Sequence, residues 1–229
     1  MKKLILTLAS LALAPAAFAQ VEIGLKISPS ITSLRAESPA PESFQGTDSK
    51  VSFGGGVFVD YFFGQNYAIN TGLFLTGKGG SFTYTDTGKG GMASSYKQPM
   101  SQKLTMQYLE IPATIKLFTN EVAPATRLYF QVGPSIAIPV GTRINGEKFY
   151  TDTFTQAQSS ASSHVFAVDV NLLGSVGAEY QLGSSTKLLA GLSYHRGLLD
   201  LDRYFEKERG FKDVSIKNSV FALDLGIKF

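Results

Sequence analysis

Between Val21 and Phe229 the sequence alternates between apolar and polar residues with a period of two, and this alternation constrains the fold more than any other feature. Successive side chains of a β-strand point to opposite faces of the sheet, so the pattern predicts strands with two unlike faces. Eight segments show it, at residues 21–33, 51–62, 67–78, 104–118, 127–140, 164–182, 187–197 and 216–229. The sequence therefore predicts an all-β protein with eight strands.

The connections between these segments are of two kinds. Short connections, at 63–66, 119–126 and 183–186, alternate with long ones, at 34–50, 79–103, 141–163 and 198–215. In an antiparallel sheet, this order puts every short turn at one end and every long loop at the other, as in transmembrane barrels. We expect an eight-stranded antiparallel up-and-down transmembrane β-barrel in a bacterial outer membrane, with periplasmic turns and termini.

Within the regularly alternating part of each segment, the apolar face carries no Asp, Glu, Lys, Arg or His, although 17% of the chain is charged. The opposite face holds Glu22, Lys26, Asp60, Glu110, Lys116, Arg127, Asp169, Glu179, Asp224 and Lys228. A charge that faces lipid at the bilayer centre costs about 2–4 kcal/mol for Arg or Lys. We therefore expect the uncharged face to contact hydrocarbon and the charged face to line the lumen.

A soluble lipocalin-like barrel that binds a small apolar ligand is the alternative, because its apolar face would be the interior. Strands of nine or more residues favour the membrane, since about 9–11 tilted residues span a bilayer. Aromatic residues near the strand ends also favour it, as two interfacial girdles. The girdles are predicted from Tyr61, Phe62, Phe63, Tyr67, Phe118, Tyr180 and Phe229 at the turn end and from Phe166, Tyr194 and Phe221 at the loop end.

The first nineteen residues have the features of a secretory signal peptide. Lys2 and Lys3 precede an apolar run at 4–14, and Ala17-Phe18-Ala19 provides small residues before a cleavage site. We expect a signal peptide at 1–19 and an outer-membrane β-barrel domain at 20–229. Cleavage removes two lysines and lowers the net charge from +3 to +1, so the mature chain has no electrostatic footprint for nucleic acid.

Two prolines interrupt the predicted strands. Pro112 and Pro134 each lack the N–H that a strand donates to its neighbour, and a closed barrel has no free edge to accommodate them. We expect a bulge or a local bend at each proline.

The sequence Tyr108-Leu109-Glu110-Ile111-Pro112 resembles the YLEIP element of the outer-membrane β-barrel family that includes the PorT-like proteins of Bacteroidetes. Supporting matches are Gly133-Pro134, the run at 177–180 and the run at 194–198. The resemblance covers nearly the whole mature chain. It implies an outer-membrane location in a bacterium of that phylum and brings no catalytic residues. One member acts in type IX secretion, and the sequence does not link this chain to that role.

An eight-stranded barrel has an interior that side chains just fill. Phe58, Phe62, Phe74 and Tyr129 belong to the inward set together with the charges. We expect a plugged lumen in which carboxylates and amines pair, and we expect Glu110 and Lys116 to brace it. A narrow pore is the alternative.

A barrel-embedded lipid hydrolase is a further alternative, because Ser193 and His195 share a face and Asp200 follows. These side chains are expected to form an inner polar network, since a triad needs mutual contact and a substrate path. His164 lies at the end of a loop, and two histidines without Cys make a poor metal site. We expect no enzyme activity, no cofactor and no metal.

The expected partners follow from the membrane location and from the loops. Lipid and lipopolysaccharide would surround the outer wall, and the barrel assembly machinery would act on the last strand, which ends in Phe229. An envelope protein is a further candidate partner, through loops 79–103, 141–163 and 198–215, because long loops often carry function. The predicted role is structural, accessory or interaction-based in the cell envelope.

Overall fold

The computed structural model describes residues 21–88, 97–153 and 156–229, and the predicted signal peptide lies outside these residues. Eight long antiparallel strands form one sheet. They are β1 (Val21–Glu37), β3 (Lys50–Gly64), β4 (Tyr67–Asp86), β5 (Gln98–Ala123), β6 (Thr126–Ile144), β9 (Asp169–Gln181), β10 (Lys187–Gly197) and β11 (Ser215–Lys228). The two-residue strand β2 (Gln45–Gly46) adds to the sheet between β1 and β4.

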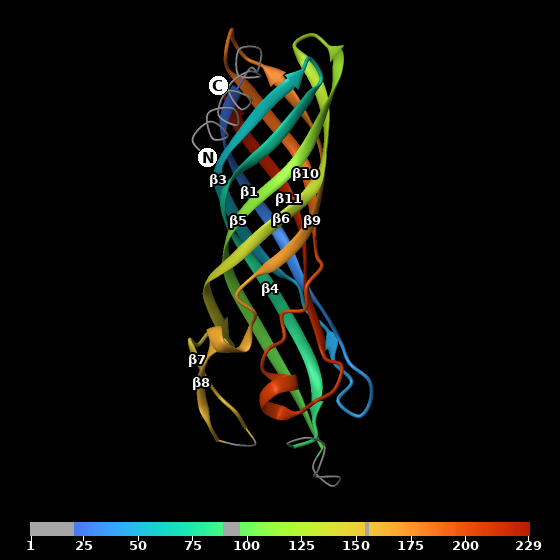
Figure 1. Cartoon of the computed structure of the whole chain (residues 1–229), viewed down its shortest axis with the longest axis vertical. Helices are drawn as coiled ribbons and strands as arrows, with labels where there is room; N and C mark the ends of the chain where they lie inside the picture. Colours follow the sequence, from blue (N-terminus) through green and yellow to red (C-terminus); the bar gives the residue numbers. More distant parts are fainter. Residues whose placement is uncertain (1–20, 89–96, 154–155) are drawn as a thin grey trace, which may run out of the picture.

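The sheet closes on itself because β1 pairs with β3 on one side and with β11 on the other. Every other long strand pairs with its neighbours in the chain, which confirms the predicted up-and-down barrel. Figure 1 shows the strands running obliquely along a tall ring, with the C-terminal end of β11 at the same end as the short turns. The loops gather at the opposite end.

The two faces of the sheet are as predicted. Apolar residues of the outward phase are solvent-exposed, for example Leu25 at 54%, Val132 at 54% and Leu223 at 43%. Charged residues of the inward phase are buried, among them Asp60, Lys116 and Lys228. Phe62 and Phe118 were wrongly placed in the girdle, because both lie in the inward phase and are buried in the lumen.

The loops are shorter than predicted because β4, β5 and β6 continue well beyond the apolar belt. Most of the segment 79–103 is strand, paired from Gly79↔Thr105 to Asp86↔Gln98. The alternation persists there in weaker form, with Phe82 and Tyr84 inward and small hydroxyl residues outward. The turn at 119–126 is also shorter, since β5 ends at Ala123 and β6 starts at Thr126.

The remaining loops contain short elements. A hairpin of β7 (Phe149–Thr151) and β8 (Gln158–Ser160) leads into the 3₁₀ helix η3 (Ala161–His164), and the π-helix η4 (Phe205–Arg209) lies in the last loop. These elements sit at the lower end in Figure 1. No helix among the described residues is long and apolar enough to cross a membrane.

No bulge lies at Pro112 or Pro134, so of the two expected irregularities only a local bend stays a prediction. The β5–β6 register is the same on both sides of the prolines, from Pro112↔Ser135 to Ile115↔Val132, and only the pairs between them are missing. The missing proline donor thus interrupts the ladder without shifting it. A register shift does occur nearby, between Gln107 and Tyr108 opposite Pro139.

Candidate functional site: the barrel lumen and its cap

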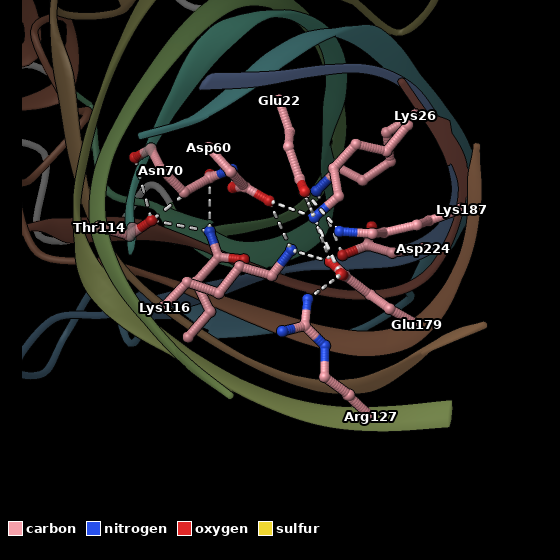
Figure 2. A network of polar contacts seen from close by, with 12 residues as sticks. Glu22, Lys26, Asp60, Asn70, Thr114, Lys116, Arg127, Glu179, Lys187 and Asp224 are labelled. Carbon is pink, nitrogen blue, oxygen red and sulfur yellow. Dashed lines mark hydrogen bonds and ion pairs between the residues drawn. The ribbon is translucent and has the colours of Figure 1, made fainter. Parts of the chain in front are cut away.

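The turn-side half of the lumen holds a network of ion pairs, shown in Figure 2 with its side chains converging on the barrel axis. Lys228 Nζ lies 2.7 Å from Glu22 Oε2, 2.9 Å from Asp60 Oδ2 and 2.8 Å from Glu179 Oε1. Lys116 Nζ joins two of these carboxylates, at 3.2 Å from Asp60 Oδ2 and 2.8 Å from Glu179 Oε1. Seven strands are linked in this way, because Arg127 also pairs with Glu179 and Lys187 pairs with Glu22.

Aromatic rings enclose this network. Phe62 and Phe118 stack with their centroids 5.3 Å apart, and Lys228 Nζ lies 5.4 Å from the first ring and 5.3 Å from the second. Tyr129 of β6 lies over Gly177 of β9 and Gly191 of β10, where a Cβ atom would lie 2.5 Å and 2.2 Å from its hydroxyl. Side chains at these two glycines would collide with the phenol, so the glycines make room for it.

The middle of the lumen is organised around Glu110. Its carboxylate accepts hydrogen bonds from Ser135 Oγ at 2.6 Å and Thr76 Oγ1 at 3.0 Å, and lies 3.2 Å from Lys78 Nζ and 3.0 Å from His195 Nδ1. This geometry explains the YLEIP pattern. Its tyrosine, glutamate and proline point into the lumen, and its leucine and isoleucine point outward.

A cavity of about 40 Å³ adjoins Glu110 and His195, and Lys26 and Lys78 also line it. A buried water needs roughly 10–15 Å³ of such space, so the cavity holds only a few waters. Lys26 itself pairs with Asp224 at 3.2 Å.

The lumen charges balance. Six carboxylates, of Glu22, Asp60, Glu110, Asp169, Glu179 and Asp224, form ion pairs with six cations, of Lys26, Lys78, Lys116, Arg127, Lys187 and Lys228. Buried charges are costly unless paired and hydrogen-bonded. The predicted bracing by Glu110 and Lys116 is observed, although each pairs with other residues.

The structure does not assemble the serine, histidine and aspartate considered for hydrolysis. His195 contacts Glu110, and Ser193 Oγ is buried with no hydrogen-bond partner among the described residues. Asp200 accepts hydrogen bonds from the backbone N–H groups of Asp202 and Ile216. These three side chains therefore lack the mutual contacts that a triad requires.

The loop-side mouth is filled by a folded unit, here called the cap, that the sequence did not predict. Its buried rings are those of Phe44, Phe82, Tyr84, Tyr150, Tyr204, Phe205 and Phe211. Phe205 of η4 lies at the centre, with its centroid 4.9 Å from that of Phe44 and 5.0 Å from that of Tyr84. Aromatic residues from three loops and from the extension of β4 thus pack over the lumen.

Arg209 holds the elements of the cap together. Its side chain is 1% exposed, its guanidinium binds Asp86 on β4 and Asp152 next to β7, and the Asp152 carboxylate also accepts a hydrogen bond from the Tyr204 hydroxyl. Burial alone would lower the pKa of Arg209, but these two carboxylates outweigh it and raise the pKa. A single arginine thereby joins the last loop to the loop between β6 and β9 and to the β4–β5 ribbon.

Two titratable groups of the cap have displaced pKa values. Burial lowers the pKa of His164 to about 4, beside a Tyr204 ring whose centroid is 3.9 Å away. Burial raises the pKa of Asp202 to about 6, against three backbone N–H groups that favour the carboxylate. His164 Nε2 also lies 2.7 Å from Ser159 Oγ. The residues that the structure describes include no group of three His, Asp or Glu side chains suited to a metal ion.

A closed antiparallel ring with an apolar outer wall and an ionic interior defines a transmembrane β-barrel of the outer-membrane type. The chain belongs to the outer membrane protein β-barrel domain family, whose sequence model matches residues 18–203. This membership places the protein in the outer membrane. It does not resolve the PorT-like group within the family.

Solved outer-membrane barrels resemble the chain. Neisserial surface protein A has a TM-score of 0.43 at 12% identity, covering 92% of this chain and 99% of its own. Ail of Yersinia pestis has a TM-score of 0.40 at 12% identity, covering 90% and 98%. OprG of Pseudomonas aeruginosa has a TM-score of 0.43 at 11% identity, covering 90% and 95%. No curated protein matches in sequence.

Proposed function

We propose that this protein is a closed, non-catalytic barrel that acts as a structural or accessory interaction component of the cell envelope. The observation that carries the proposal is the charge-balanced lumen, sealed by aromatic side chains at the turn end and by the cap at the loop end. An ion would have to displace paired charges on the way through. A narrow pore therefore lacks a path, and a lumen hydrolase lacks substrate access.

The proposal also states how the barrel is oriented in the outer membrane and to which subgroup of the family it belongs. The short turns and both chain ends face the periplasm, and the cap faces outward, because transmembrane barrels have short periplasmic turns and longer outer loops. The YLEIP element supports a place among the PorT-like barrels of Bacteroidetes, since its three inward residues build the middle of this lumen.

Planar-bilayer recording of the purified full-length protein tests the closed lumen. We expect no unitary conductance above baseline for the wild type. The variant Phe62→Ala/Phe118→Ala removes the turn-side rings, and it should stay closed as well, because the paired charges and the cap still block the lumen. Reproducible wild-type channels would refute the closed barrel.

Site-specific photocrosslinking in cells tests the interaction role. Phe149 on the outward hairpin is 63% exposed, and Val122 at a turn on the opposite end is 55% exposed. A photoreactive residue at 149 should give one discrete protein adduct that position 122 does not give. The absence of an adduct at 149 would contradict a partner at the cap and leave the purely structural role.

A further inference from the structure

Three cations lie on the outer wall, directly beyond the apolar belt on adjacent strands. The outward apolar series within β10 ends at Tyr194, Arg196 is the next outward residue, and the exposed Leu198 and Leu199 follow past the end of the strand. On β1 and β11 the outward residues just past the belt are serines, followed by Arg35 and Lys217. All three cations thus face the loop-side edge of the membrane.

The strand register brings these cations together. Arg35 lies directly opposite Lys217, and Arg196 lies opposite Ser219, two residues along β11 from Lys217. Neighbouring strands are about 4.8 Å apart, and two residues along a strand span about 6.8 Å. Arg35 Nη2 donates to the backbone oxygen of Gly197 at 2.6 Å, which holds its guanidinium toward β10.

No acidic side chain neutralises this cluster. In the described part of the chain, none of the three cations lies within ion-pair distance of a carboxylate, and Glu37 further out on β1 makes no pair with them. Like charges directly opposite one another destabilise a sheet. In the lumen, by contrast, Lys26, Lys78, Lys116, Lys187 and Lys228 each have a carboxylate partner, so the outer cluster is the one that is available to an anion from outside the chain.

An apolar groove of about 450 Å³ lies on the outer wall next to these cations, toward the turn end of the barrel. Its floor is Gly174 on β9, where an added Cβ would have no heavy atom within 4 Å. Gly174 is level with Tyr194, and Arg196 is level with the next outward residue of β9, Leu172. Phe130, Leu192 and Phe221 form walls of the groove within the hydrocarbon-facing belt.

We propose that this wall binds one molecule of lipid A, with a phosphate on Arg35, Arg196 and Lys217 and an acyl chain in the groove at Gly174. The proposal rests on the proposed orientation, which places the cations in the outer leaflet, where the abundant phosphorylated amphiphile is lipid A. Clusters of Lys and Arg next to the hydrocarbon region bind anionic headgroups. The cations can contact the phosphate of such a lipid, and the groove can hold one of its acyl chains.

Native mass spectrometry of the full-length protein in mild detergent, titrated with purified bisphosphorylated lipid A, tests the site. The variant Arg196→Gln/Lys217→Gln removes two cations and spares Arg35, which binds the backbone. The control variant Lys103→Gln/Arg143→Gln removes two exposed outward cations from the β5–β6 wall. Gly174→Leu fills the groove without removing a charge.

We expect one lipid A bound to the wild type, at least tenfold weaker binding by Arg196→Gln/Lys217→Gln, a several-fold loss for Gly174→Leu, and binding by the control within twofold of wild type. Equal losses in both double variants would overturn the site, because they would indicate attraction by net charge alone. Phosphatidylglycerol bound as tightly as lipid A would overturn the identity of the lipid. A conducting barrel that still shows the predicted pattern would refute the closed-lumen function alone.

Discussion

The turn-side network and the loop-side cap both exclude water from the barrel, but they do so by different means. The network consists of charges from seven strands, held at fixed positions by a closed ladder. The cap consists of aromatic side chains from loops and strand extensions. It lies beyond the membrane in contact with water, so the hydrophobic effect stabilises it. Separating the network requires the ring itself to open, whereas the cap can open alone. Four predictions test this difference.

The largest effect is expected for Lys228→Met, which leaves the Glu22, Asp60 and Glu179 carboxylates without their shared cation. Removing one member of a buried ion pair costs about 3–5 kcal/mol, and the loss should appear in global unfolding. Urea unfolding in lipid vesicles, followed by the gel shift between folded and unfolded barrel, measures it. Lys187→Met is the control, since Lys187 pairs with Glu22 alone and Glu22 keeps Lys228 as a partner, and it should lose clearly less than Lys228→Met. Equal losses would contradict the role of shared pairing.

A similar loss confined to the cap is expected for Phe205→Ala. Truncating a buried phenylalanine costs about 3–5 kcal/mol, here at the centre of five aromatic rings. Hydrogen exchange should become faster at 198–214, while the barrel strands and the global urea midpoint remain unchanged. Phe149→Ala removes the same side chain from an exposed position and should alter neither. A shift of the global midpoint by Phe205→Ala would show that cap and ring unfold together.

The cap should respond to pH through two opposing groups. The pKa of His164 is lowered to about 4, so its contribution to cap stability is lost as the pH falls from 6.5 to 4. The pKa of Asp202 is raised to about 6, so its contribution is present at low pH and is lost as the pH rises from 3.8 to 6. The two nearly cancel in the wild type.

Replacing one group at a time should reveal the opposite pH dependences that Asp202 and His164 give to cap stability. Asp202→Asn keeps an acceptor for the η4 backbone. Its cap should lose about 1–3 kcal/mol of stability on acidification from pH 6.5 to 4 and therefore open more readily. His164→Phe keeps the stack on Tyr204, and its cap should become more stable on acidification over the same range. Hydrogen exchange at 198–214, corrected for the intrinsic pH dependence, measures each. The same pH profile in both variants would refute the assignment.

The sequence was sufficient for the ring because one physical rule governs every spanning residue. A strand that crosses a bilayer needs an apolar outer residue at every second position, so Leu25 and Asp224 could be placed on their faces without a structure. The rule also gave the strand number, the chain order and the position of the long loops. It failed for Phe62 and Phe118, which were assigned to a girdle by residue type although their phase is inward.

The cap could not be predicted from the same rule. Beyond the membrane the outward residues of β4 are Ser and Thr, so the contrast between faces disappears, and only the inward Phe82 and Tyr84 indicate that the strand continues. Arg209 meets Asp86 and Asp152 across long stretches of sequence, and no spacing predicts such a contact. Ser193 and His195 share a face as predicted, yet the nearest strong partner of the histidine is Glu110, on a strand from another part of the chain.

The smallest effect is expected for Ser193→Ala, which removes a buried hydroxyl that has no hydrogen-bond partner in the described residues. Because the folded protein recovers nothing for dehydrating that hydroxyl, its loss should be neutral or stabilising by up to about 1 kcal/mol. Ser135→Ala is the matched change, since Ser135 Oγ donates to Glu110 at 2.6 Å, and it should destabilise by about 1–3 kcal/mol. Urea midpoints in vesicles measure both. If Ser193→Ala destabilised the barrel as much as Ser135→Ala, the serine would have a partner, and the inner polar network would extend further along β10 than the present contacts indicate.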